Sequence, residues 1–150
     1  MRYFCNMKKI HSTRDFDFYS PEFSELELSF AGDVNAGFPS PAEDFSREKI
    51  DLNKLLIKHP EATFYAKVKG SSMRGDFSEG DLLVIDRSVE YSDNRIALCF
   101  IDGEFTLKRI RYIDGKCFLT PSNDDFPLLE VNPESNSLIW GVVTYSIKKH

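Results

Sequence analysis

Residues 95–112, RIALCFIDGEFTLKRIRY, decide the fold. Two runs rich in β-branched and aromatic side chains, which favour strands, flank the dipeptide Asp102-Gly103. An Asp-Gly linker of two residues predicts a tight β-hairpin, because its turn needs positive φ at both positions. Asp114-Gly115 repeats the signal ahead of another strand-like run at 116–120. The centre of the chain is therefore predicted to be an antiparallel β meander.

Other segments extend this core. Pro41 at the first helical position behind Ser40 predicts one short helix, and Asp51 can cap a second helix over 52–58. Further strands are predicted from composition and alternation at 63–69, 82–86 and 137–147. The fold class is mainly β, with an antiparallel core and two short helices.

Residues 1–36 lack a strong helical period. The polar and apolar alternation of 24–30 predicts one strand or an extended N-terminal arm. The bond between Ala36 and Gly37 lies in a run of small residues that is typical of an exposed loop, where proteolysis concentrates. A narrow active site could cut there. We therefore expect residues 1–36 to be an arm removed by cleavage and residues 37–150 to form the core domain.

Composition limits the function classes. A chain of 150 residues with 41% hydrophobic and 29% charged residues can form one soluble domain with a tail. The net charge of −5 argues against direct DNA binding, which relies on Lys and Arg to neutralise phosphates. Lys108, Arg109 and Arg111 form either a local basic patch or, more simply, a solvated strand face.

The termini and cysteines indicate a cytoplasmic protein. No apolar run approaches the ~20 residues of a membrane helix, and the first residues do not resemble a secretory signal. The three cysteines are widely spaced without metal-ligand patterns, so we expect no metal, no cofactor and no disulfide framework. Cys99, inside an apolar run, is expected to be buried.

Ser72 and Lys108 form a candidate catalytic pair. A lysine held neutral by an apolar setting can take the proton of a serine nucleophile, without any histidine. Thr106 lies two residues before Lys108 on the same strand face and could orient its amine, although strand propensity alone also explains a threonine there. The backbone N–H groups of Ser72 and Met73 could stabilise an oxyanion. Taken singly, a serine in a turn and a lysine on a strand usually have no catalytic role.

A Ser-His-Asp triad is not expected. His11, His59 and His150 lie in an N-terminal arm, at a helix end and at the last residue, respectively. Asp81 and Asp86 flank a predicted strand and are interpreted as structural turn residues.

Four motifs together resemble the LexA-type self-cleaving serine peptidases, and most closely their UmuD-like SOS mutagenesis members. They are KGSSMRGDFSEGDLLVIDRS (69–88), DGEFTLKRI (102–110), AGFPSPAEDF (36–45) and IWGVVTYSIKK (139–149). The resemblance implies a strongly bent antiparallel β core that forms a homodimer. It implies Ser72 as nucleophile, Lys108 as general base and Ala36-Gly37 as the self-cleavage bond.

The same resemblance implies the partners. Cleavage is expected to be stimulated by a RecA filament on single-stranded DNA. The trimmed homodimer is then expected to join a UmuC-type Y-family DNA polymerase in translesion synthesis.

Three alternatives remain open. A self-cleaving LexA-like regulator would need an N-terminal helix-turn-helix, for which the stretch before Ala36 is too short and too poorly periodic. A signal-peptidase-like enzyme would use the same Ser–Lys chemistry but normally needs a membrane anchor. In a non-catalytic dimeric interaction module, Ser72 would be inert, and only activity separates that case.

Overall fold

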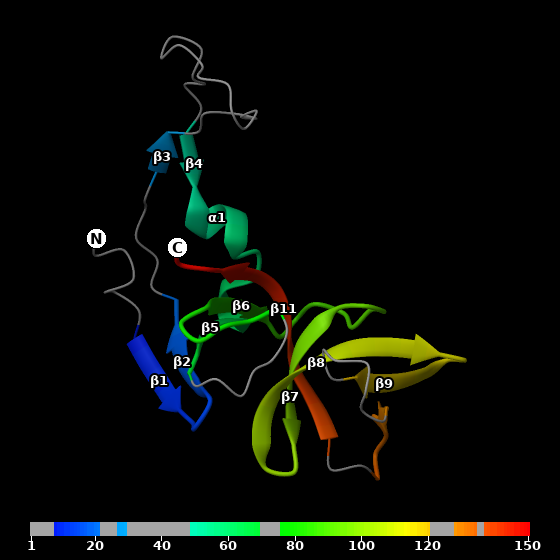
Figure 1. Ribbon diagram of the computed structural model, residues 1–150. Coiled ribbons are helices and arrows are strands. Elements are labelled where there is room, and N and C mark those ends of the chain that lie inside the picture. The colour runs from blue at the N-terminus through cyan, green and yellow to red at the C-terminus, as the bar shows by residue number, and fades with distance from the viewer. Residues whose placement is uncertain (1–7, 22–26, 30–48, 70–75, 121–127, 135–136) are drawn as a thin grey trace. The chain divides into compact units, whose positions relative to one another are not determined.

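The computed structural model describes residues 8–21, 27–29, 49–69, 76–120, 128–134 and 137–150 (Figure 1). The chain divides into two compact units. The larger contains residues 1–22 and 59–150, and the smaller contains residues 23–58.

The larger unit is one antiparallel sheet. Among the described residues it has nine strands in the order β1-β2-β5-β6-β11-β7-β8-β9-β10. Their bounds are β1 Lys8–Ser12, β2 Phe16–Ser20, β5 Thr63–Val68, β6 Leu82–Asp86, β7 Ile96–Ile101, β8 Glu104–Ile113, β9 Lys116–Thr120, β10 Leu129–Glu130 and β11 Ser137–Ile147. The mainly β fold class predicted from the sequence is confirmed.

Strand β11 joins the two halves of this sheet. Its first part pairs with β7 from Ser137↔Ile101 to Val142↔Ala97, and its second part pairs with β6 from Val142↔Asp86 to Ile147↔Leu82. The pairing register shifts on each side of the crossing, between residues 139 and 141 and between residues 143 and 145. Such irregularities bend a strand and increase its twist. Figure 1 shows β11 running between β6 and β7.

Two apolar clusters lie on opposite faces of the β7–β8 ribbon. The cross-strand pair Leu98↔Leu107 belongs to the first cluster, whereas Ala97 and Cys99 belong to the second. Successive side chains of a strand point to opposite faces, which places the clusters on different sides. The first cluster contains Phe16, Phe18, Ala66, Val68, Leu83, Ile85, Leu98 and Leu107, and the second contains Ala97, Cys99, Ile110, Leu119 and Ile139.

Most local predictions are confirmed. Strands β6 and β11 have the predicted bounds, and β5, β7, β8 and β9 agree within one residue. Asp102 and Gly103 have φ of 49° and 85°, and Asp114 and Gly115 have φ of 51° and 77°, as these hairpin turns require.

The N-terminal segment differs from a simple extended arm. Residues 8–20 form the β1–β2 hairpin, and β2 pairs with β5 at one end of the larger sheet. The alternation of Phe16 and Phe18 with Asp17 was the available signal, because apolar residues two apart share one face of a strand.

The smaller unit contains β3 Glu27–Ser29, β4 Lys49–Asp51 and helix α1 Leu52–Leu56. Strand β3 falls within the predicted extended segment 24–30 and pairs with β4. Asp51 caps α1 as predicted, since its carboxylate accepts hydrogen bonds from the N–H groups of Asn53 and Lys54. The helix predicted behind Ser40 lies outside the described residues.

The crossing of β11 generates a stability prediction. A methyl group added at Gly141 would lie 2.6 Å from Cγ2 of Ile85, where the surrounding strands are buried. We therefore expect Gly141→Ala to lower the free energy of unfolding by about 1–3 kcal/mol in urea titrations.

The matched control is the double variant Gly141→Ala/Ile85→Ala, which removes the clashing Cγ2. It should cost less than the sum of the two single substitutions. Unfolding of Gly141→Ala at the wild-type urea concentration would contradict this packing account.

Candidate functional site

Lys108 and Thr106 occupy adjacent positions on one face of β8. Lys108 pairs with Ala97 and Thr106 pairs with Cys99, and both partners are fully buried members of the second cluster. Lys108 itself is half-buried. Strand pairing therefore sets the stem of Lys108 beside apolar side chains.

Lys108 differs from the other basic residues of β8 in its contacts. Arg109 donates to the backbone oxygen of Asn94 at 2.9 Å and lies 3.6 Å from the carboxylate of Asp76. Arg111 lies 3.6 Å from the carboxylate of Asp93. Across the part of the chain that the structure describes, Lys108 has no hydrogen-bond or ion-pair partner. The three basic residues of β8 therefore do not form one uniform face. Arg109 and Arg111 have carboxylate partners, whereas Lys108 has none among the described residues.

Cys99, the strand partner of Thr106, lies in an apolar environment. It is buried, as predicted, and burial raises the pKa of its thiol to about 12, although the nearby positive charge of Lys108 acts in the opposite direction. Burial therefore keeps the thiol of Cys99 in its neutral form.

The nucleophile predicted from the sequence, Ser72, lies outside the described residues. The segments on either side of it are described. The N–H of Val68 donates to the backbone oxygen of Asp81 at 2.9 Å, and the N–H of Gly80 donates to the backbone oxygen of Val68 at 2.9 Å. Asp76, the first described residue after Ser72, lies 3.6 Å from Arg109 on β8.

The other predicted positions also fall outside the described residues. They are Met73, proposed to help stabilise an oxyanion, and the cleavage-site residues Ala36 and Gly37.

The structure contains a His–Asp–Ser cluster that is not arranged as a triad. Nδ1 of His59 lies 2.6 Å from Oδ2 of Asp86, and the hydroxyl of Ser88 donates to Oδ1 of Asp86 at 2.6 Å. In a catalytic triad the serine would instead contact the histidine. Asp81 is likewise held by the N–H of Ser78 and by Lys148, both at 2.9 Å. Both aspartates serve structural roles, as the sequence indicated.

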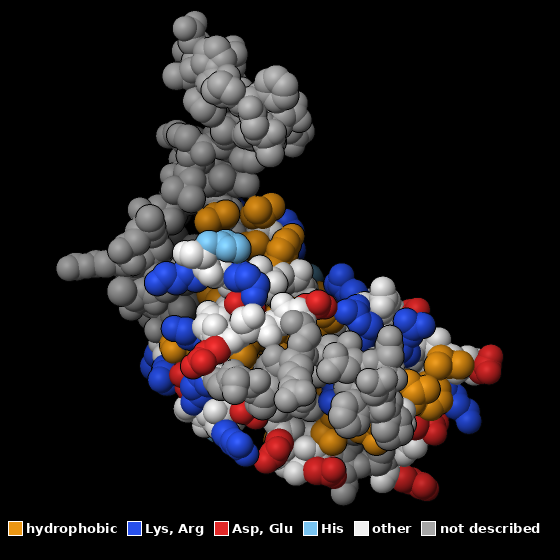
Figure 2. Space-filling view, in the orientation of Figure 1, with side chains coloured by type: hydrophobic (Ala, Val, Ile, Leu, Met, Phe, Trp, Pro, Cys, Tyr) orange, Lys and Arg blue, Asp and Glu red, His pale blue; other side chains and the backbone are white. Residues whose placement is uncertain are grey.

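The described surface carries both signs of charge. Figure 2 shows Lys and Arg side chains interspersed with Asp and Glu on the face in view. The described ranges hold no group of three or more His, Cys, Asp or Glu able to bind a metal ion. No helix among the described residues is long and apolar enough to cross a membrane.

Comparison with known proteins identifies the class. Residues 29–144 match the family described as Peptidase S24-like, so the chain belongs to this family of self-cleaving serine peptidases related to the SOS response.

Individual relatives indicate which group within the family the chain belongs to. The chain is 42% identical to protein MucA of Salmonella typhimurium over 78% of this chain and 81% of MucA. It is 40% identical to protein ImpA of Salmonella typhimurium over 87% of this chain and 89% of ImpA. It is 30% identical to the LexA repressor of Paracidovorax citrulli over 95% of this chain and 64% of LexA. The chain is thus a UmuD-like member of the family.

Sequence reasoning missed two features beside the candidate site. One is the contact between Asp76 and Arg109, which joins segments far apart in the chain. The other is Lys69, three residues before Ser72, which binds the N-terminal hairpin through Asp17 at 3.0 Å. Neither pair has a local signal, because each depends on tertiary contact.

The His59–Asp86–Ser88 cluster predicts an acid-sensitive contribution to stability. Burial disfavours the Asp86 carboxylate, but hydrogen bonds from Ser88 and His59 outweigh burial and lower the pKa of Asp86 from its usual 3.8. A lowered folded-state pKa means that the unfolded chain binds more protons in acid. The stabilisation is therefore present at neutral pH and lost as the pH falls through the lowered pKa.

The difference in unfolding free energy between wild type and Asp86→Asn should shrink from about pH 6 to about pH 3. Denaturant titrations at each pH measure it. A difference that stays constant over this range would show that Asp86 has no lowered pKa.

Proposed function

We propose that this protein cuts itself between Ala36 and Gly37 by a Ser–Lys mechanism, with Ser72 as nucleophile and Lys108 as general base. The observation that carries the proposal is the setting of Lys108. It is half-buried, it faces an apolar cluster, and it has no partner among the described residues. A lysine can accept a proton only when it is neutral, so the proposal requires Lys108 to be neutral when Ser72 attacks.

Chain geometry supports the pairing of Ser72 with Lys108. Ser72 is four residues from Asp76, whose carboxylate contacts the residue after Lys108. Four residues span at most about 14 Å, which limits how far Ser72 can lie from this part of β8. A Ser–Lys contact is compatible with that limit.

The proposed reaction needs no cofactor or metal. Oγ of Ser72 attacks the carbonyl carbon of Ala36 while Lys108 takes the hydroxyl proton. The C–N bond then breaks, and Lys108 returns the proton to the amine of Gly37. Water hydrolyses the remaining ester, with Lys108 first accepting a proton from the water and then returning it to Ser72. Backbone N–H groups at Ser72 and Met73 would stabilise the oxyanion, and Thr106 would orient the lysine.

We extend the proposal to the biology of UmuD-like proteins. In this view the protein acts in the cytoplasm as a homodimer, a RecA filament on single-stranded DNA stimulates the cut, and the cut form serves a UmuC-type Y-family polymerase in translesion synthesis. The homodimer contact is proposed around Trp140 to Ile147, a stretch whose part after Val142 pairs, among the described strands, with β6 and not with β7.

A LexA-like regulator is the second candidate. It is the weaker one because MucA and ImpA are each matched over more than four-fifths of their length, whereas LexA is matched over 64%.

The catalytic pair is tested by two substitutions. Ser72→Ala and Lys108→Met should both abolish self-cleavage, because uncatalysed amide hydrolysis is too slow to detect. Lys108→Met keeps the apolar stem and removes the amine, so the variant should stay folded. Wild-type cleavage, followed by intact mass between about pH 7 and pH 10, should accelerate with pH as lysine becomes neutral.

Lys116→Met is the matched control, because it removes an exposed strand lysine outside the proposed pair and should still be cut. The Ser–Lys assignment would be falsified by a folded Lys108→Met protein that is cleaved at the wild-type rate.

The bond itself is tested by Ala36→Trp. A bulky side chain next to the cut bond should crowd a narrow active site and slow the appearance of a fragment of residues 37–150, measured by mass spectrometry. Cleavage of Ala36→Trp at the same bond and speed as wild type would rule out a narrow site.

A further inference from the structure

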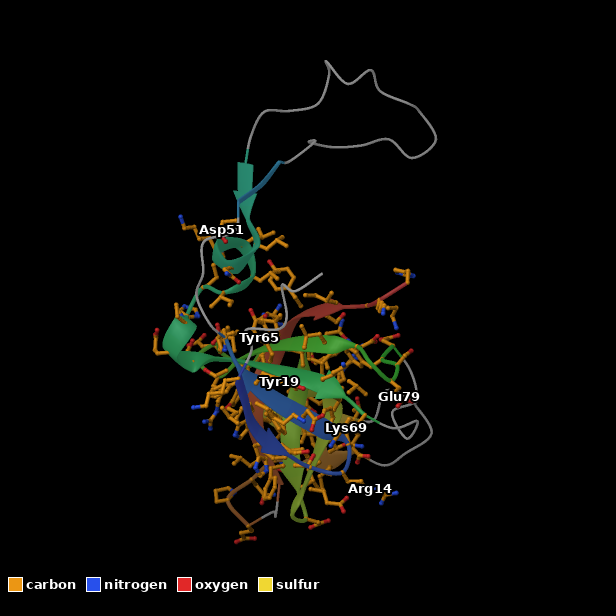
Figure 3. All side chains as sticks on the ribbon, turned by 90° about the vertical axis from the view of Figure 1, so that its left-hand side faces the viewer. Arg14, Tyr19, Asp51, Tyr65, Lys69 and Glu79 are labelled. Atoms are coloured by element: carbon orange, nitrogen blue, oxygen red, sulfur yellow. The ribbon has the colours of Figure 1, made fainter. Side chains whose placement is uncertain are left out.

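The β1–β2 hairpin is part of the core, although it precedes the proposed cut. Strand β2 pairs with β5 from Phe16↔Val68 to Tyr19↔Tyr65. Figure 3 shows Tyr19 and Tyr65 on these neighbouring strands. The hairpin also lies outside the family match, which begins at residue 29. Its role therefore has to be read from this chain.

Two aromatic side chains anchor the hairpin. Phe16 is 0% and Phe18 is 3% exposed. The ring of Phe18 lies 4.9 Å from that of Phe105 on β8 and 5.7 Å from that of Trp140 on β11. The hairpin thus contributes to the first apolar cluster across several strands. If the hairpin dissociated, Phe16 and Phe18 on the hairpin and the rings that they cover on the core would become exposed to water.

A polar group of residues adds a second attachment. Nζ of Lys69 lies 3.0 Å from Oδ1 of Asp17 and donates to Oγ of Ser12 at 2.9 Å. The N–H of Lys69 donates to the backbone oxygen of Asp15 at 2.8 Å. Figure 3 labels Lys69 at the end of β5, beside the turn that contains Arg14. Backbone and side-chain hydrogen bonds and an ion pair therefore attach the hairpin to Lys69, the residue that follows β5.

The smaller unit supplies an independent attachment across the same bond. Strand β3 precedes residue 36 and β4 follows residue 37, and the two pair from Glu27↔Asp51 to Ser29↔Lys49. A cut between residues 36 and 37 breaks none of the contacts described for β2–β5 or β3–β4.

We propose that the 1–36 fragment remains bound after the cut, with residues 8–20 as two strands of the sheet and β5, Phe105 and Trp140 as its docking surface. The occupant of this surface in the cut protein is the chain's own N-terminal hairpin. The product is then a two-piece protein and not a trimmed core, in contrast to the removed arm expected from the sequence. The inference rests on the proposed function only for the position of the cut.

The test uses the full chain with Ser72→Ala and a recognition sequence for a site-specific protease placed at residues 34–38. After cutting by the added protease, gel filtration and native mass spectrometry follow both pieces without denaturant. The expected species has the mass of the uncut chain plus one water. A core of residues 37–150 that elutes free of the N-terminal piece would overturn the proposal.

Matched variants locate the docking surface. Phe18→Ala should weaken retention by about a hundredfold or more, because deletion of a buried phenylalanine ring is among the costliest core changes. Ile10→Ala, in the same hairpin but 46% exposed, should leave retention unchanged. Equal retention in both variants would show that Phe18 does not hold the fragment. If Phe18→Ala does not fold before cutting, Lys69→Met, which removes the bonds to Asp17 and Ser12, replaces it and should weaken retention.

The same readout on the wild-type chain separates this inference from the proposed function. If wild type does not cut itself but the protease-cut chain keeps its hairpin, self-cleavage fails and retention stands. If wild type cuts itself and the N-terminal piece dissociates, self-cleavage stands and retention fails.

Discussion

The structure depends on the double pairing of β11. One strand, Ser137–Ile147, bonds to β7 along its first part and to β6 along its second, and Val142 faces a partner on each side. Gly141 beside Val142 allows a close approach to β6, because a Cβ at this position would lie 2.6 Å from Cγ2 of Ile85. Without that crossing, the two halves of the larger sheet would have no common strand.

Strand β8 has two different faces, because successive side chains of a strand point to opposite sides. Leu107 packs into the first apolar cluster, whereas Lys108 and Thr106 point to the side of the second. On that face the thiol of Cys99 is buried, and burial raises its pKa to about 12. The candidate catalytic lysine thus owes its setting to the packing of the sheet. Arg109 and Arg111, one and three positions further along β8, have carboxylate partners.

The N-terminal hairpin shows how a segment can lie on one side of a proposed cut and fold with the other. Phe16 and Phe18 are as deeply buried as the residues of the central strands. They are held by strand pairing with β5 and by ring contacts with Phe105 and Trp140, and none of these contacts involves residue 36. Cutting such a chain at residue 36 creates two new chain ends but breaks none of the described contacts of the hairpin.

The local elements and the candidate chemistry could be predicted from the amino-acid sequence. Asp-Gly turns, the Asp51 cap and the strands from residue 63 onward follow from backbone preferences and from the alternation of side chains, which act over a few residues. The family could also be recognised from ordered motifs. The tertiary structure decided the placement of β11 between β6 and β7, the incorporation of residues 8–20 and the partners of the basic residues on β8. These depend on pairing between segments tens of residues apart, which is governed by burial and register in the whole sheet. A local pattern such as the alternation of Phe16 and Phe18 indicates a strand but does not indicate its partner.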